Sequence, residues 1–243
     1  MTDTQMESPL LDFHRAAGVE LETYFGVTLP AQFAGTAAEH STARQSVALI
    51  DTNFRSVFSL AGPDRVRYLN AVLTSNVRDL QPGQGAIGLL LNAQGHILAE
   101  LETLACEDRI VVLGHALGRA KTAEILEKFI IMDDATLTDE TGQSGTLAVE
   151  GPLAPAMARE LAEIDLLALP ARGHVPITVK CASGEEIPCR VIRRSLYGFP
   201  GAEFLLPRDA LGALWGVLAV AVRKQGGAPV GYRALNALRL EAG

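Results

Sequence analysis

The stretch from Gly85 to Leu104, GAIGLLLNAQGHILAELETL, predicts two strands joined by a tight turn. Residues 87–91 form an apolar run, and residues 92–95 (NAQG) have turn chemistry, because glycine adopts positive φ at little cost. The second strand carries an acid, Glu100, among apolar neighbours. Such a carboxylate lies either on the wet face of a half-buried strand or in a pocket that uses its charge. Spacing alone favours the wet face, with Glu102 as a neighbour on the same face.

The order of elements repeats along the chain. Each copy reads as a strand, a Gly-Pro pair, a helix, further strands and a second helix. The first copy starts with the strand at Arg55–Leu60 and the second with the strand at Thr146–Val149. Gly-Pro pairs commonly precede helices, but here the whole order of elements matches. The sequence therefore predicts a duplicated α+β module with antiparallel strands.

The two ends of the chain add helices and one further β segment. The patterns predict a short helix over 8–19, a β-like segment from Glu20 to Leu29, and a helix over roughly 36–48. The last residues, Pro229 to Gly243, read as a helix without a C-cap. We therefore expect a C-terminal part of the protein to be absent from this chain.

Composition limits which binding partners and which cellular compartment we expect for this protein. The chain has 243 residues and a net charge of −7, which argues against nucleic acid or an anionic membrane as the main partner. No apolar run approaches the ~20 residues of a membrane span, and the N-terminus lacks the pattern of a signal peptide. The three cysteines, Cys106, Cys181 and Cys189, are too few for a disulfide framework. We expect reduced thiols and a cytoplasmic protein.

Several common kinds of chemistry lack a motif in this sequence. The five histidines are scattered, with no pair at metal-ligand spacing. Phosphate loops, dinucleotide fingerprints and GxSxG elbows are missing, and none of the cysteines has an activating context. Metal, nucleotide and nucleophilic chemistry are therefore weakly supported.

Two further polar residues lie on apolar elements. Glu203 follows a Gly-rich turn at the start of an apolar strand. Its carboxylate could accept hydrogen bonds from the N–H/NH₂ pair of a flat heterocycle, or it could face water at a strand edge. Arg233 lies off the apolar stripe of the last helix, where it could fork onto a carboxylate or remain an exposed surface arginine. Composition does not decide between the two alternatives for Glu203 or for Arg233. Taken by itself, Arg233 is better explained as an exposed surface arginine.

Five motifs together resemble one known family. They look like the folate-binding superfamily of the glycine-cleavage T-protein (aminomethyltransferase), and within it most like the YgfZ-type branch. The resemblance runs from about Ser46 to Gly243 with order and spacing kept. The motifs are SVALIDTNFRSVFSLAGPDRVRYLNAVLTSNVRDLQPGQG, LLNAQGHILAEL, LAVEGP, YGFPGAEFLLP and GYRALNALRLEAG.

This resemblance implies a fold of duplicated ferredoxin-like modules around a folate pocket. The first module would be interrupted, with residues 1–54 and 141–243 packing together and residues 55–140 inserted as the second module. Family members usually continue into a C-terminal barrel-like domain, which this chain lacks.

The resemblance also implies roles for individual residues. Glu203 matches the glutamate that binds the pterin ring, and Arg233 matches the arginine near the folate tail. Glu100 matches the second acid of an Asp-Asp pair that assists chemistry at the folate nitrogens, which reverses the preference for a wet residue. Here the pair is Ala99-Glu100.

Two more pocket positions depart from the T-protein pattern. Ile87 stands where T-proteins often have tyrosine, and His115 lies near a family asparagine. We therefore expect a tetrahydrofolate-binding protein of the YgfZ type that assists iron–sulfur cluster assembly or repair, with iron–sulfur enzymes as partners. The alternative is an aminomethyltransferase that moves a one-carbon unit from a lipoyl carrier protein to tetrahydrofolate. Whether the chain is an enzyme stays open.

Overall fold

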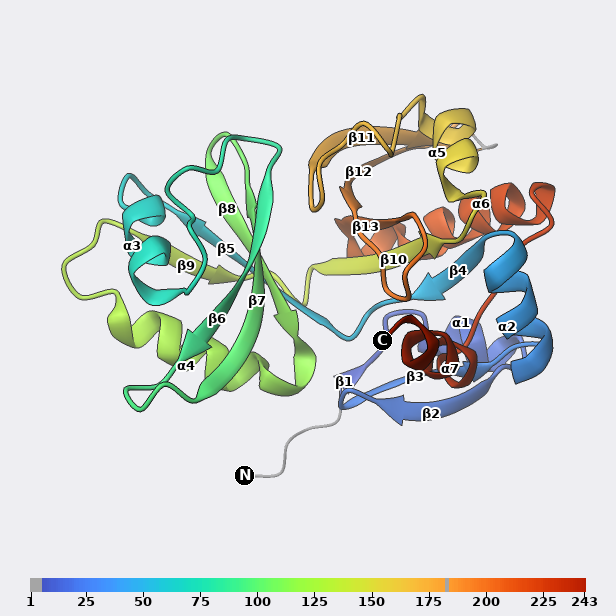
Figure 1. Ribbon diagram of the computed structural model, residues 1–243, viewed down its shortest axis with the longest axis horizontal. Coiled ribbons are helices and arrows are strands. Elements are labelled where there is room, and N and C mark those ends of the chain that lie inside the picture. Colours follow the sequence, from blue (N-terminus) through green and yellow to red (C-terminus); the bar gives the residue numbers. More distant parts are fainter. Residues whose placement is uncertain (1–5, 182–183) are drawn as a thin grey trace. The chain divides into compact units, whose positions relative to one another are not determined.

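The computed structural model describes residues 6–181 and 184–243 and divides the chain into two compact units (Figure 1). Unit 1 comprises Met1–Phe54, Gln143–Ala171 and Val175–Gly243, and unit 2 comprises Arg55–Gly142 and Arg172–His174. Each unit combines helices with a mainly antiparallel sheet, which confirms the predicted α+β class.

Unit 2 is a five-stranded antiparallel sheet with two helices on one face. Leu69 from α3 and Leu126 from α4 pack against strand residues such as Phe58, Leu101 and Val112, which form the core. The strand order is β6-β7-β8-β5-β9. The elements are β5 (Arg55–Ala61), α3 (Arg65–Val72), β6 (Gly85–Leu91), β7 (Ile97–Ala105), β8 (Arg109–His115), the 3₁₀ turn Ala116–Gly118, α4 (Arg119–Phe129) and β9 (Thr136–Asp139).

The predicted hairpin is confirmed as β6 and β7. Asn92 closes the turn, because its side-chain oxygen accepts hydrogen bonds from the backbone N–H groups of Gln94 and His96 at 3.0 and 2.9 Å. Gly95 supplies the positive φ of +81° that the turn needs. This geometry sets the register in which Leu89 pairs with Glu100.

The second copy of the module lies in unit 1. Its element order, strand-helix-three strands-helix-strand, is the same as in unit 2. Among the described residues its sheet has the order β11-β12-β13-β10-β4-β14, with α5 and α6 packed on one face. The elements are β10 (Ser144–Glu150), α5 (Ala154–Ala162), β11 (His174–Lys180), β12 (Glu186–Arg193), β13 (Gly201–Pro207), the 3₁₀ turn Arg208–Ala210, α6 (Leu211–Lys224) and β14 (Ala228–Pro229).

The remaining elements of unit 1 come from both ends of the described chain. A small sheet of order β1-β3-β2 contacts α1 and α7, and β4 joins the larger sheet between β10 and β14. The elements are β1 (Met6–Glu7), α1 (Leu11–Ala16), β2 (Glu20–Tyr24), β3 (Val27–Gln32), α2 (Thr36–Gln45), β4 (Ala48–Asp51) and α7 (Tyr232–Ala242).

Two sequence-based expectations for this region are corrected by the structure. The single β-like segment over 20–29 is a hairpin, because Phe25 and Gly26 both take positive φ and turn the chain. The helix predicted over 36–48 ends at Gln45, and Ala48–Asp51 is a strand. Its residues pair antiparallel with β10 and parallel with β14, so sheet pairing decides their conformation.

In the described part of the chain, no helix is long and apolar enough to cross a bilayer.

Candidate functional site

Glu203 lies inside the larger sheet of unit 1. On β13 it pairs with Ala148 of β10 and with Ile192 of β12. Its neighbours Ala202 and Phe204 belong to the core under α5 and α6, so the Glu203 side chain projects to the other face of the sheet. The residue is 0% exposed. Of the two alternatives, the structure therefore shows a buried acid and not a strand-edge acid facing water.

The buried charge of Glu203 has a cationic partner. The Arg194 guanidinium donates a hydrogen bond to Glu203 Oε2, and the Arg194 side chain is 12% exposed. Burying a carboxylate without such a partner is costly, so the pair allows the acid to stay ionised inside the fold. Sequence reasoning missed Arg194, although its position nine residues before Glu203, across the β12–β13 connection, was an available signal.

Glu150 organises the loop that connects β12 to β13. Its carboxylate accepts hydrogen bonds from the Ser195 hydroxyl (2.9 Å) and from the backbone N–H groups of Leu196, Tyr197 (2.8 Å) and Phe199 (3.1 Å). Glu150 is 1% exposed, and this burial raises the pKa of its carboxyl despite the four hydrogen bonds. The loop next to Arg194 and Glu203 is therefore held by a buried acid that sequence reasoning did not single out.

Arg233 is the second residue of α7, and its side chain contacts two acids. Its guanidinium donates to Glu20 at 2.5 Å and to Glu22, two alternate residues of β2. These hydrogen bonds hold the pKa of the Glu22 carboxyl below its usual value. The Tyr24 hydroxyl also donates to Glu22 at 2.5 Å. Arg233 thus forks onto carboxylates of its own unit, while Glu203 has a different cationic partner.

The three candidate residues of unit 2 share one face of its sheet. Glu100 pairs with Leu89, Ile87 pairs with Glu102, and His115 pairs with Arg55. Because paired residues and alternate residues of a strand point to the same side, these side chains lie on the face opposite the helices. Glu100 and His115 are exposed, and Ile87 is half-buried. The strands therefore place the predicted residues on a common surface of unit 2.

Glu102 is the buried acid of this face. It is 3% exposed, and one of its carboxylate oxygens lies 3.7 Å from Nε of Arg172. In the sequence, Glu102 is conspicuous only as the same-face neighbour of Glu100. The available signal was a pair of acids two residues apart in a strand whose other residues, except Thr103, are apolar.

These arrangements can bind a polar heterocycle and anionic groups through carboxylates and guanidinium groups. Within the described residues, no group of three or more His, Cys, Asp or Glu side chains is placed to hold a metal ion.

A comparison with known protein families identifies the family of this chain. Residues 10–243 match the family model described as the GCVT N-terminal domain. The chain belongs to this family. This GCVT-family chain is 28% identical over 242 residues to an aminomethyltransferase of Mycobacterium avium (strain 104), covering 98% of the chain and 63% of that relative. It is 32% identical over 244 residues to an aminomethyltransferase of Synechococcus sp. (strain WH7803), covering 97% of the chain and 64% of that relative.

Solved structures show the same fold for the GCVT-family chain. The glycine cleavage system aminomethyltransferase T from Bartonella henselae superposes with a TM-score of 0.78 at 23% identity, over 98% of this chain and 63% of that one. The heterotetrameric sarcosine oxidase from Corynebacterium sp. U-96 superposes with a TM-score of 0.58 at 15% identity, over 80% of this chain and 94% of the matched one. The GCVT-family chain spans less than two thirds of the length of the aminomethyltransferases named here.

The resemblance to the T-protein superfamily is thereby confirmed. The curated relatives named above are aminomethyltransferases, which favours the alternative function over the YgfZ-type one. Membership of the YgfZ branch stays a prediction.

Proposed function

We propose that this chain binds tetrahydrofolate and that the protein acts as a folate-dependent aminomethyltransferase. The observation that carries the proposal is the Glu203 carboxylate, which is fully buried on the sheet face opposite α5 and α6 and is paired with Arg194. Membership of the GCVT N-terminal family and the names of the relatives support the same function.

The residues of unit 1 fit the polar groups of a folate. A carboxylate is an acceptor of hydrogen bonds, so Glu203 would accept from the N–H/NH₂ edge of a pterin. Arg233 is about one third exposed, so its guanidinium can reach a carboxylate of the folate tail by sharing or exchanging Glu20 and Glu22. Both contacts are charge-assisted and therefore stronger than neutral hydrogen bonds.

Glu100 is the residue proposed to hold or move a proton. Tetrahydrofolate, when bound, supplies the nitrogen atoms that receive the one-carbon unit. An exposed carboxylate close to those nitrogens would act as a general acid or base. Glu100 reaches one methylene further than the aspartate of T-proteins, and a displacement of about 1 Å can cost ~100-fold in rate. Ile87 and His115 share this face of unit 2 with Glu100 and would provide further contacts to the folate.

Titration calorimetry with tetrahydrofolate tests the binding proposal. Glu203→Gln keeps the shape of the side chain but removes its charge, and Arg233→Ala removes the proposed tail contact. Losing a charge-assisted hydrogen bond costs about 1.5–3 kcal/mol, so each variant should bind roughly 10- to 150-fold more weakly. Glu186→Gln, an exposed acid of β12, is the matched control and should bind as the wild type does. Equal affinity of all four proteins would remove the proposed pocket.

A chain extended to the full length of the relatives should be titrated beside this one, because this chain spans less than two thirds of their length. Transfer itself is tested with an aminomethylated lipoyl carrier protein as the donor. We expect the wild type to form methylene-tetrahydrofolate. Glu100→Gln should form this product more slowly while its affinity for tetrahydrofolate stays nearly unchanged.

A second candidate function is the YgfZ-type upkeep of iron–sulfur enzymes. Ala99 in place of the first acid of the pair favours it, because one carboxylate of the T-protein arrangement is then missing. If the protein has this function, it should bind tetrahydrofolate without transferring a one-carbon unit to it. Its partners would be iron–sulfur enzymes, whose activity should fall in cells that lack the protein and recover when it is restored.

A further inference from the structure

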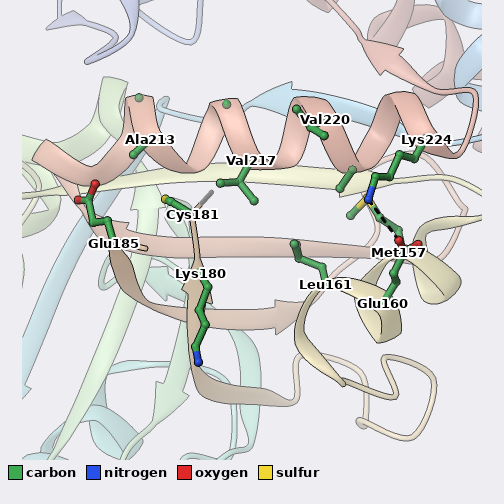
Figure 2. Close-up of a pocket in the computed structure, with 13 residues that line it drawn as sticks. Met157, Glu160, Leu161, Lys180, Cys181, Glu185, Ala213, Val217, Val220 and Lys224 are labelled. Carbon is green, nitrogen blue, oxygen red and sulfur yellow. Dashed lines mark ion pairs between the residues drawn. The ribbon is translucent and has the colours of Figure 1, made fainter. Parts of the chain in front are cut away.

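Arg233 shares its positive charge between two acids, Glu20 and Glu22. A simpler ion pair lies at the groove between α5 and α6, which has a volume of about 500 Å³ (Figure 2). There Lys224 pairs with Glu160 at 3.6 Å. The lysine pair has no net formal charge, whereas the Arg233 cluster has a formal excess of one negative charge.

The two acids occupy the part of the guanidinium that carboxylates use most. Arg233 Nη2 donates to Glu20 Oε1 at 2.5 Å and also to Glu22 Oε1. A carboxylate forks onto a guanidinium through Nη2 together with either Nη1 or Nε, so each arrangement needs a hydrogen of Nη2. Both hydrogens of this nitrogen are donated within the cluster. An incoming carboxylate therefore has to displace Glu20 or Glu22 before it can form a bidentate pair.

Other donors orient the two acids from their own strands. Gln32 Nε2 of β3 donates to Glu20 Oε2 at 2.6 Å, and the Tyr24 hydroxyl of β2 donates to Glu22 Oε2 at 2.5 Å. Burial and the hydrogen bond to Glu22 raise the pKa of Tyr24 to about 12, so its hydroxyl remains a donor at neutral pH. The acids are thereby held in place for Arg233, which lowers the entropy cost of the pairs.

We propose that Glu20 and Glu22 make this site selective for folates with a short glutamate tail, an inference that rests on the proposed function, in which Arg233 contacts the tail. A tail carboxylate that displaces one acid replaces one charge-assisted hydrogen bond by another, so it gains little affinity. Each further glutamate of the tail brings another carboxylate to a cluster with excess negative charge, and like charges repel. Arg233→Ala remains damaging, because it leaves both acids beside the tail without their cation.

The size of the effect follows from the exposure of the cluster. The side chains of Arg233, Glu20 and Glu22 are between about one third and one half exposed. Ion pairs at such positions are weak, and two of them are lost when both acids are neutralised. The affinity that depends on the tail should therefore rise by roughly 2- to 30-fold in Glu20→Gln/Glu22→Gln.

Titration calorimetry with tetrahydrofolate and with its triglutamate form tests the proposal. The first ligand carries two carboxylates and the second carries four. The wild type should bind the triglutamate no more tightly than tetrahydrofolate. Glu20→Gln/Glu22→Gln should shift the preference towards the triglutamate by roughly 2- to 30-fold. Glu7→Gln, which removes one exposed acid of the same small sheet, is the matched control and should keep the wild-type preference.

Salt provides a second measurement that needs no variant. Raising the ionic strength from ~0.05 to ~0.5 M screens charges, so the wild type should bind the triglutamate better relative to tetrahydrofolate. A relative affinity that falls with salt would show that the longer tail is attracted, and would overturn the inference.

The outcomes separate this inference from the proposed function. A wild type that prefers the triglutamate, or a double variant whose preference stays within twofold of the wild type, overturns the selectivity and leaves tetrahydrofolate binding intact. If neither the wild type nor the double variant binds either ligand, the proposed function and the selectivity both fail.

Discussion

Removing the carboxylate of Glu150 should loosen the loop Ser195–Phe199, and the two oxygens of that carboxylate have unequal roles. Oε1 accepts from Ser195, Tyr197 and Phe199, whereas Oε2 accepts from the Leu196 N–H group. In Glu150→Gln the amide oxygen can replace Oε1 and keep three bonds. The amide NH₂ then faces the Leu196 N–H group, which leaves one donor against another.

The magnitudes follow from this count. An unsatisfied buried donor costs about 1–3 kcal/mol. Glu150→Gln should lose stability in the lower part of that range, because the Leu196 N–H group is only part-buried and the variant no longer buries a charge. Glu150→Ala removes the acceptor for four donors. The N–H of Tyr197 is buried, while the other three donors can recruit some water. We therefore expect Glu150→Ala to lose about 3–5 kcal/mol.

The raised pKa of Glu150 makes the stability of the folded chain depend on pH, and the direction of this dependence follows from the direction of the shift. Below pH 4.5, its ordinary value, the carboxyl is protonated in the folded and the unfolded chain. As the pH rises from 4.5 through the raised folded value, the unfolded chain releases this proton more readily than the folded one. The part of the stability that comes from the raised pKa of Glu150 is therefore lost across that window. Glu150→Gln lacks this loss, so its deficit relative to the wild type should shrink as the pH rises.

Urea unfolding followed by tryptophan fluorescence measures these changes, because the single tryptophan, Trp215, lies in the core of unit 1. Glu186→Gln, at an exposed position of β12, is the control for a charge change alone. If Glu150→Ala is destabilised by less than about 0.5 kcal/mol, the size of an ordinary surface substitution, the loop is not held by this carboxylate and the reasoning fails.

Three other predictions concern single side chains. Arg233→Ala should raise the pKa of Glu22 towards its ordinary 4.5, as seen in an NMR titration of the carboxyl; an unchanged value would mean that the pair does not persist in solution. Gly151→Ala should lower the melting temperature sharply, because Gly151 has φ +147° and a Cβ there would lie 2.1 Å from a backbone oxygen, whereas Gly142→Ala meets nothing within 4 Å and should melt almost as the wild type does in calorimetry. Burial raises the pKa of the Cys189 thiol to about 12, so mass spectrometry after brief alkylation at about pH 8 should find it the least modified of the three cysteines.

Local signals predicted the parts of the fold that depend on local structure. The hairpin over 85–104 was recognisable because its turn chemistry and its apolar run lie within one short stretch. Ala48–Asp51 was not recognised, because this wholly buried strand has no alternation and follows a helix without Gly or Pro between them. Its conformation is decided by partners about 100 and 180 residues further along the chain.

In the candidate site, too, local sequence signals predicted only those features that depend on local structure. Glu203 could be singled out because an acid in an apolar strand is conspicuous, and its burial by the neighbouring strands required the structure. The function of Glu150 could not be read from sequence, because three of its four partners are backbone N–H groups of a loop about 45 residues away. Backbone donors carry no residue signature. An acid that binds them looks like any other glutamate before a Gly-Pro pair.

The position of β4 between β10 and β14 has a consequence for the order of folding. All five strands of unit 2 lie within Arg55–Asp139, so its contacts can form while the chain is still being synthesised. The larger sheet of unit 1 needs β4 from the start of the chain and β14 from near residue 229. Closing such long loops is slow, and β4 keeps an unpaired edge until the later strands are made. We therefore expect nascent chains that stop before β10 to contain a folded unit 2 and an aggregation-prone N-terminal segment.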